Sequence, residues 1–296
     1  MKPAPLPTSE PLVASSTGES NSDLLARFNS LGYLYFPGFV KTAKCQAMLE
    51  EFLGGLAGHI GYDEASRMPV LTGEPFTETD ATWDKLYPVM QSSQRFHEFF
   101  HEDDIQQLMQ RVLGTPAFVY PMKMARVASP RMRGHETPPH QDAHSHQGGP
   151  TMAGIWVALH DVVAGMGRLK LLPGSHLRGV RAIHEATGVG GVQCEIFPDE
   201  TCWHVSDVGQ GDVIIFHACC IHCAEPNTTD RQVRISVDTR FCAHGEPVFI
   251  TNVDPHHGWR IEGLDWQRIY RDWDSTTLQY YWRDYPDITR IPLADR

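Results

Sequence analysis

The chain has 296 residues, of which 41% are hydrophobic and 21% charged, a balance that excludes a disordered or fibrous protein and predicts a soluble globular one. Its 25 lysines and arginines against 36 aspartates and glutamates give a net charge of −11, the opposite of what nucleic-acid or anionic lipid binding requires. No apolar run reaches the roughly 18 residues that cross a bilayer, so we expect no membrane span.

The first third of the chain is predicted to be helical behind a disordered tail. Residues 1–21 are rich in proline and small polar residues without hydrophobic periodicity, which is typical of a mobile segment. We expect one domain over residues 22–296, in which residues 22–115 carry most of the helices. The predicted elements are a helix from its N-cap Ser22 to Gly32, a strand over 33–36, and helices over 42–56 and 103–113.

Residues 116–243 are predicted to form the β-structure. Short β-branched or aromatic runs bounded by turns predict strands over 153–159, 168–172, 213–216 and 233–241. Because no long helix separates these runs, a mostly β protein with flanking helices, built as an antiparallel barrel or jelly roll, is favoured over a parallel α/β sheet. Residues 244–296 are rich in tryptophan and tyrosine, which we expect to pack on the barrel or in an oligomer contact, with a lid over the site as the alternative.

Three motifs in this region carry chemistry. His140-x-Asp142 places an imidazole and a carboxylate on one face of an extended segment, which suits two ligands of one metal. His222 follows about 80 residues later, after a turn and an apolar strand. Two histidines and one carboxylate form the facial triad of non-haem Fe(II) oxygenases. Arg234 and Ser236 then share a strand face, and a guanidinium pairs well with the distant carboxylate of a dicarboxylic acid.

In this order, the motifs resemble the phytanoyl-CoA hydroxylase (PhyH-like) superfamily of Fe(II)/2-oxoglutarate-dependent dioxygenases, over residues 23–243. The resemblance implies a double-stranded β-helix, a jelly-roll core of the cupin-like kind, with 2-oxoglutarate and O₂ as co-substrates. The segments that carry it are Gly32-Tyr33-Leu34-Tyr35-Phe36-Pro37-Gly38-Phe39, Pro139-His140-Gln141-Asp142, Gly154-Ile155-Trp156-Val157-Ala158-Leu159, Gly167 to His176, and Gly211-Asp212 through His222 to Arg234.

The resemblance also implies roles for individual residues. His140, Asp142 and His222 would be the iron ligands. The residues that would contact 2-oxoglutarate are Arg234 as anchor, Ser236, Trp156 and, in a looser match, Arg126. Because the interval from His222 to the arginine is one residue longer than the family pattern, Arg231 is an alternative anchor; the Arg-x-Ser pair favours Arg234.

Other residues near the motifs are candidates for the substrate pocket. Tyr120, Met122 and Met124 alternate before Arg126, so one face of that strand is predicted to line the pocket, with core packing as the alternative. His144 is a further candidate for substrate contact. His176 is expected to be structural, and His217 is expected to point away from His222. Related halogenases leave the ligand position of the carboxylate free for chloride. Because Asp142 fills this position, halogenation is disfavoured.

The predicted reaction is oxidation, by default hydroxylation, of a C–H bond in a small-molecule metabolite, for instance of secondary metabolism. Desaturation, epoxidation and cyclisation use the same machinery, and the sequence does not separate them. An acyl-CoA substrate is the alternative within the family, disfavoured by the acidic, lysine-poor composition. A non-catalytic metal-binding sensor and a zinc hydrolase are the alternatives from other classes. The oligomeric state is left open.

The cysteines and the N-terminus predict a cytoplasmic protein. Seven is an odd number of cysteines, and residues 1–23 contain no basic, apolar and cleavable leader. We therefore expect free thiols in a reducing compartment. Cys219, Cys220 and Cys223 flank His222, but no second Cys-x-x-Cys pair exists to complete a structural zinc site, so buried or half-buried thiols are expected.

Overall fold

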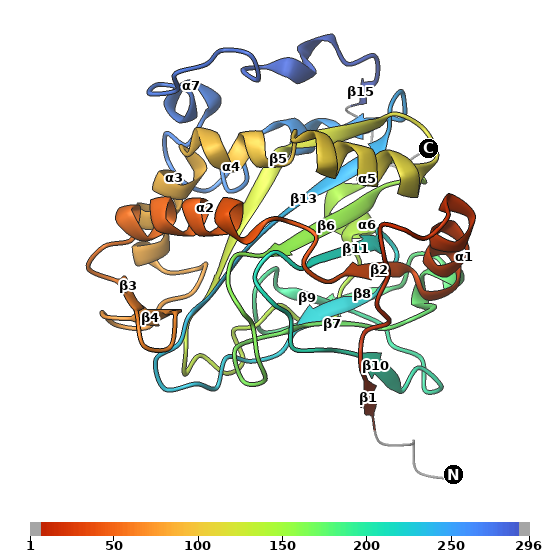
Figure 1. Cartoon of the computed structure of the whole chain (residues 1–296), viewed down its shortest axis with the longest axis horizontal. Coiled ribbons are helices and arrows are strands. Elements are labelled where there is room, and N and C mark those ends of the chain that lie inside the picture. The colour runs from red at the N-terminus through yellow and green to blue at the C-terminus, as the bar shows by residue number, and fades with distance from the viewer. Residues whose placement is uncertain (1–6, 290–296) are drawn as a thin grey trace.

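The computed structural model describes residues 7–289, which form a large and a small β-sheet flanked by helices (Figure 1). The large sheet has the strand order β2-β11-β6-β13-β5 and the small sheet the order β1-β10-β7-β12. The strands of the large sheet are β2 (Tyr33–Phe36), β11 (Val213–His217), β6 (Ala153–Ala158), β13 (Arg234–Ala243) and β5 (Ala117–Ala128). Those of the small sheet are β1 (Thr8–Glu10), β10 (Cys202–His204), β7 (Leu169–Leu171) and β12 (His222–Ala224).

The remaining elements are short strand pairs and helices. The pairs are β3 (Ile60–Asp63) with β4 (Met68–Leu71), β8 (Ile183–Glu185) with β9 (Val192–Cys194), and β14 (Val248–Phe249) with β15 (Ile288–Thr289). The α-helices are α1 (Asn21–Leu31), α2 (Thr42–Gly55), α3 (Ala81–Gln91), α4 (Gln94–Phe99), α5 (Asp103–Leu113), α6 (Asp142–His146) and α7 (Trp266–Ile269). Single 3₁₀ turns are η1 (Ser175–Arg178), η2 (Ile250–Val253) and η3 (Tyr281–Asp284). Among the described residues, no helix combines the length and apolarity that a membrane crossing needs.

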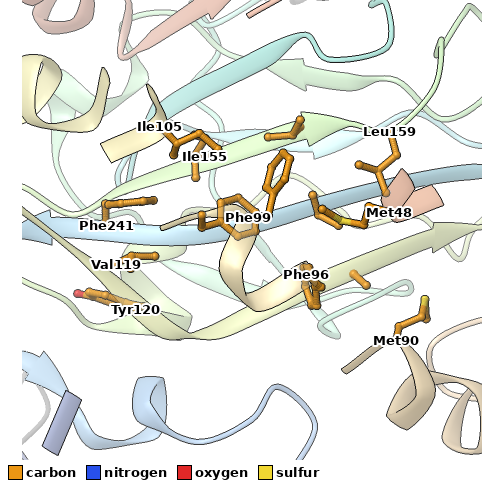
Figure 2. Close-up of a cluster of buried hydrophobic side chains, with 14 of the residues drawn as sticks. Met48, Met90, Phe96, Phe99, Ile105, Val119, Tyr120, Ile155, Leu159 and Phe241 are labelled. Atoms are coloured by element: carbon orange, nitrogen blue, oxygen red, sulfur yellow. The ribbon is translucent and has the colours of Figure 1, made fainter. Parts of the chain in front are cut away.

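The side-chain alternation of the large sheet separates a hydrophobic core from a polar face. In β6, β11 and the first part of β13, odd-numbered residues such as Ile155, Ile215 and Val237 belong to the main core, together with residues of the helices. Figure 2 shows Phe96 and Phe99 of α4 among these strand side chains. Even-numbered residues of the same strands point to the opposite face. The polar side chains of β13, described below, lie on that second face.

The helices cover the first face of the sheet and are in turn covered by the C-terminal segment. In Figure 1, α3, α4 and α5 run alongside β5 and β13, and the C-terminal segment lies on their outer side. Trp266 and Trp273 contact the ring of His97 in α4, and Trp273 Nε1 donates a 3.0 Å hydrogen bond to the Ser92 carbonyl. The rings of Trp266 and Trp273 are therefore packed against the helices. Trp259 is the exception because it is 66% exposed.

The predicted helices and strands are found with small shifts at their ends. The helices over 42–56 and 103–113 correspond to α2 and α5, and the four predicted strands of the β region to β6, β7, β11 and β13. The first helix is capped by Ser20, whose Oγ accepts a 3.2 Å hydrogen bond from Asp23 N, so the prediction of Ser22 as the cap is wrong. Gly32 ends this helix in the left-handed conformation, as expected.

The expected disorder of residues 1–21 is wrong for the part that the structure describes. Thr8 to Glu10 pair in parallel with β10, and Leu12 is buried beside Tyr33 in a second core cluster. The backbone of this segment gains strand hydrogen bonds from a partner nearly 200 residues away. The amino-acid composition of the segment does not reveal that a distant strand is available for pairing. Residues 1–6 of the predicted tail lie outside the described residues.

Candidate active site

Two histidines and an aspartate meet at the edge of the small sheet. His140 and His222 form an isolated antiparallel bridge, in which the backbone N–H of each donates to the carbonyl of the other at 2.9 and 3.0 Å. Asp142 is the first residue of α6, two positions beyond His140. One ligand atom from each of the three side chains lies within 4.8 Å of the other two. Nε2 of His140 is 3.9 Å and Nε2 of His222 3.8 Å from Asp142 Oδ1.

The local backbone orients both imidazoles for metal binding. Nδ1 of His140 donates to the Pro138 carbonyl at 2.8 Å, and Nδ1 of His222 donates to the Cys220 carbonyl at 3.0 Å. Because a carbonyl only accepts, each ring carries its proton on Nδ1 and turns the lone pair of Nε2 toward Asp142. Burial, with a smaller contribution from His222, lowers the pKa of His140 to about 3, and burial lowers the pKa of His222. Both rings are therefore neutral and able to bind a cation.

Asp142 supplies a negative charge to this cluster. Its side chain is 1% exposed, and it forms an ion pair with Arg240 of β13. Burial alone would raise the pKa of Asp142, but the Arg240 guanidinium holds it well below its ordinary range. Two neutral imidazoles and one carboxylate form a facial donor set that fits Fe(II) and leaves coordination positions open.

A second cluster beside the histidines offers an unpaired positive charge. Arg234 Nη1 and Trp156 Nε1 both donate to Ser236 Oγ, at 2.8 and 2.9 Å. Nε of Arg234 is buried without a hydrogen-bond partner, and among residues 7–289 no carboxylate lies within ion-pair distance of this guanidinium. Burial lowers the pKa of Arg234 to about 10, so it stays protonated at neutral pH. A buried cation without a counter-ion fits an anionic ligand.

Arg234 and the alternative anchor, Arg231, differ in their position relative to the candidate metal ligands. Arg234 and Trp156 line one cavity together with His140 and His222. Arg231 precedes β13 and is exposed. Of the two arginines, only Arg234 therefore borders the cavity of the candidate metal ligands.

Arg126 lies at the same cavity, but its charge is already paired. Its Nε donates to Asp238 Oδ1 at 3.0 Å, and its Nη1 lies 3.4 Å from Glu78 Oε1. Asp238 also pairs with Arg240 at 2.6 Å. These contacts make a continuous buried network from Glu78 to Asp142, which the sequence analysis missed. The available signal was the run of polar side chains at even positions of β13, from Arg234 to Arg240.

A larger cavity of about 460 Å³ shares His140, Arg126 and Arg240 with the first cavity. Met122, Met124 and His144 line it, as predicted for the substrate pocket, and Asp142 borders it. The walls also carry residues that the sequence analysis did not select: Glu78, Ile183, Val189, Val192, Arg240, His256, His257 and Trp259. Apart from Arg240, nothing in their local sequence marks them, because they come from loops and strands far apart along the chain.

Tyr120 is the predicted pocket residue that lies elsewhere. It is fully buried in the main core (Figure 2). The pairing of β5 with β13 is interrupted at this point: three residues of β5, including Pro121, face the single residue Arg240 between the pairs Thr239–Lys123 and Phe241–Val119. The uninterrupted alternation that placed Tyr120 with Met122 and Met124 therefore does not hold.

The other histidines and the cysteines behave as expected. His176 Nε2 contacts the Asn29 carbonyl at 3.0 Å, and its ring packs near His217, away from the candidate ligands. All seven cysteines are free thiols. Burial raises the pKa of Cys220 and of Cys223 to about 12, so both carry their protons at neutral pH.

In sequence, the chain is similar to known proteins. A family model described as phytanoyl-CoA dioxygenase (PhyH) matches residues 28–236. The chain is 26% identical over 227 residues to 1-deoxypentalenic acid 11-beta-hydroxylase of Streptomyces exfoliatus, covering 72% of this chain and 78% of the relative. It is 31% identical over 133 residues to phytanoyl-CoA dioxygenase domain-containing protein 1 of Bos taurus, covering 42% and 45%.

Solved structures resemble the fold. The epimerase SnoN, in complex with Fe³⁺, alpha ketoglutarate and nogalamycin RO, superposes with a TM-score of 0.56 at 20% identity, covering 77% of this chain and 85% of that one. The non-heme alpha ketoglutarate-dependent carbocyclase SnoK from nogalamycin biosynthesis gives a TM-score of 0.53 at 20% identity, covering 80% and 89%. At this level of identity the likeness shows a shared fold.

Proposed function

Because the chain belongs to the phytanoyl-CoA dioxygenase family, we propose that it is an Fe(II)/2-oxoglutarate-dependent oxygenase that hydroxylates a C–H bond of a small-molecule metabolite. One observation carries the proposal: three ligand atoms within 4.8 Å of one another lie beside a buried arginine to which the described part of the chain offers no counter-ion. The core is then a double-stranded β-helix, with the large and small sheets as its two layers, inside a single domain to which the N-terminal strand β1 also belongs.

In this proposal His140, Asp142 and His222 hold the iron. The two neutral imidazoles present Nε2, and their Nδ1–H groups stay bound to backbone carbonyls, which fixes each ring. Asp142 contributes the single negative charge of the set and is held in place by Arg240. Bound iron and 2-oxoglutarate would supply the oxidation of a C–H bond by O₂, with 2-oxoglutarate converted to succinate and CO₂.

Arg234 and Ser236 would bind the distant carboxylate of 2-oxoglutarate. A guanidinium offers parallel donors to both oxygens of a carboxylate. Ser236 Oγ already accepts two hydrogen bonds, so its own proton is free to be donated. Trp156 forms a wall of the same cavity. Arg126, with its charge shared between two acids, would act on this cavity by shape and hydrogen bonding rather than as the anchor.

The size and charge of the larger cavity support a small free metabolite over an acyl-CoA. A cavity of about 460 Å³ is within the usual range for a drug-sized ligand. Both guanidiniums on its wall, Arg126 and Arg240, are paired with carboxylates. The pocket therefore offers no free cation to the phosphates of coenzyme A. Efficient turnover of a phytanoyl-type CoA ester, with none of free small molecules, would contradict this substrate class.

Anaerobic titration of the Fe(II)-loaded protein with 2-oxoglutarate tests the oxygenase class. We expect a weak visible charge-transfer band from the iron–keto-acid chelate, and no band with succinate. Arg234→Ala should raise the 2-oxoglutarate concentration at half-saturation by about ten- to a hundredfold, because a charge-assisted hydrogen bond is lost. Arg231→Ala, which removes an arginine three positions earlier in the chain, is the matched control and should leave this concentration unchanged.

Two results would contradict the proposal. If the fully loaded protein gives no band, the site is not an iron–keto-acid centre, and a non-catalytic sensor or a zinc site becomes the better explanation. If Arg231→Ala weakens 2-oxoglutarate binding and Arg234→Ala does not, the anchor is wrongly assigned. Metal analysis of Asp142→Ala gives an independent check, since this variant should no longer retain iron.

A further inference from the structure

Two buried polar side chains on the wall of the larger cavity lack hydrogen-bond partners. Glu78 precedes α3 and His257 follows η2; they are 8% and 9% exposed. Oε2 of Glu78 and both ring nitrogens of His257 are buried and have no hydrogen-bond partner among residues 7–289. The two side chains are neighbours, with 3.4 Å between Glu78 Oε2 and His257 Nε2. An unsatisfied buried polar atom costs about 1–3 kcal/mol, so the facing pair of Glu78 Oε2 and His257 Nε2 on the wall of a cavity indicates a missing ligand group.

The backbone at His257 is also unusual. Its φ is +63°, in the left-handed region that only a few per cent of non-glycine residues adopt, with asparagine, aspartate and histidine the more frequent among them. The ring is held there by Tyr87 and His256, with centroid separations of 5.1 and 3.9 Å. Strained residues of this kind concentrate at ligand-binding positions, where the surrounding packing maintains them.

The charges around the cavity restrict what the missing group can be. Arg126 pairs with Glu78 and Asp238, and Arg240 pairs with Asp142 and Asp238. No guanidinium that lines this cavity is therefore free to bind a substrate carboxylate. The Arg126 guanidinium, with His257, lowers the pKa of Glu78 although burial alone would raise it, so Glu78 is ionised and repels anions.

A hydroxyl group matches the two unpartnered side chains. Its proton can be donated to Glu78 Oε2, and its oxygen can accept the N–H of His257. A carboxylate would face the Glu78 charge, and an ammonium could not accept from His257. The other walls of the cavity are largely apolar, with Met122, Met124, Ile183, Val189, Val192 and Trp259.

We propose that Glu78 and His257 form a binding site for a hydroxyl group of the substrate, which is thus an uncharged alcohol on a compact apolar skeleton. The inference rests on the proposed function, because it places the substrate in the cavity beside the candidate iron ligands. The dyad fixes where the hydroxyl sits and hence which C–H bond faces the metal side of the cavity. Glu78 and His257 are positioning residues and take no part in the oxidation itself.

Binding of three cyclohexane derivatives to the Fe(II)- and 2-oxoglutarate-loaded protein under anaerobic conditions tests the proposal. The probes are cyclohexanol, cyclohexanecarboxylate and cyclohexylammonium, titrated at millimolar concentration by NMR. We expect cyclohexanol to bind at least about tenfold more tightly than either charged probe. His257→Asn removes the imidazole and suits a positive φ, and it should abolish this preference. Glu78→Gln removes the charge and keeps the shape, and it should also abolish it.

The control variant is His184→Asn, which replaces an exposed histidine of β8 and should keep the wild-type preference. The 2-oxoglutarate charge-transfer band of each variant reports on the proposed function separately. If the band is normal but cyclohexanol does not bind, or binds no better than the charged probes, only the hydroxyl site is overturned. Retention of the preference in both His257→Asn and Glu78→Gln would also overturn it. If the wild-type band is absent, the proposed function itself fails.

Discussion

The Arg240 guanidinium meets the Asp142 carboxylate along its edge: Nη2 donates to Oδ1 at 2.9 Å, and Nε lies 2.6 Å from Oδ2. Both side chains are almost fully buried, at 3% and 1% exposure. In the proposed iron centre, Arg240 therefore balances the charge of the ligand carboxylate before metal binds. The same arginine pairs with Asp238, so one cation serves two buried acids.

Replacing Arg240 should therefore destabilise the metal-free protein more than the metal-loaded one. Arg240→Met removes the arginine partner of buried Asp142 and one of the two arginine partners of Asp238, which should lower the free energy of unfolding by about 3–5 kcal/mol. A divalent metal at the three candidate ligands would replace part of the lost positive charge. Urea denaturation with and without Mn(II) measures both values. Equal losses in the two forms would mean that Arg240 does not act on the metal site.

Loss of the Trp156 indole N–H should weaken 2-oxoglutarate binding modestly. Trp156→Phe keeps the ring but removes the 2.9 Å hydrogen bond to Ser236 Oγ, which helps to fix the direction of the serine hydroxyl. A single hydrogen bond contributes about 0.5–1.5 kcal/mol, so a two- to tenfold rise in the dissociation constant is expected. Calorimetric titration of the Mn(II)-loaded variant provides the measurement. A loss as large as that of Arg234→Ala would show that the indole contributes more than this bond.

Lys123 predicts a dependence of stability on pH. It is 1% exposed, and its Nζ contacts the Tyr120 carbonyl at 3.2 Å and the Tyr281 hydroxyl at 3.5 Å. Burial lowers its pKa from 10.5 to about 7. Between these two values the unfolded chain binds a proton that the folded chain does not, so this residue makes stability rise with pH across that window.

Lys123→Met should remove this contribution and stabilise the protein near neutral pH. At one pH unit per about 1.4 kcal/mol, the gain should reach at most about 5 kcal/mol at pH 7 and below, and shrink toward zero near pH 10.5. Chemical denaturation of wild type and variant at several pH values gives the difference curve, in which the titration of other groups cancels. A gain that does not depend on pH would show that Lys123 titrates normally in the folded protein.

Two glycines with positive φ should differ in their tolerance of a side chain. At Gly32 (φ +79°) a Cβ would lie 2.5 Å from His176 Nδ1, whereas at Gly38 (φ +60°) it would meet nothing within 4 Å. Gly38→Ala should cost about 1–2 kcal/mol from the backbone alone. Gly32→Ala should cost at least about 1 kcal/mol more, because the His176 ring must also move. Thermal unfolding of the pair compares them directly, and equal losses would exclude a steric role for His176.

The sequence by itself determined the elements whose causes are local. The helices α2 and α5, the turn at Gly32 and the strands β6, β11 and β13 follow from hydrophobic periodicity and glycine stops within a few residues. The spacing of His140, Asp142, His222 and Arg234 likewise predicted a ligand triad beside a subsite that binds an anion. Alternation along β13 would also have placed Asp238 and Arg240 on the face of Arg234, although the pattern does not name their partners.

Only the tertiary structure decided which distant segments meet. The strand pairing of residues 8–10 depends on β10, and the removal of Tyr120 from the pocket depends on an interruption of the β5–β13 ladder. The pair Glu78–His257 joins two loops with no pattern of their own. Backbone and side-chain geometry within one element is set by neighbours along the chain. Contacts between elements, and hence the pairing of buried charges and the shape of the cavity, are set by the packing of the whole chain, which a single sequence pattern does not encode.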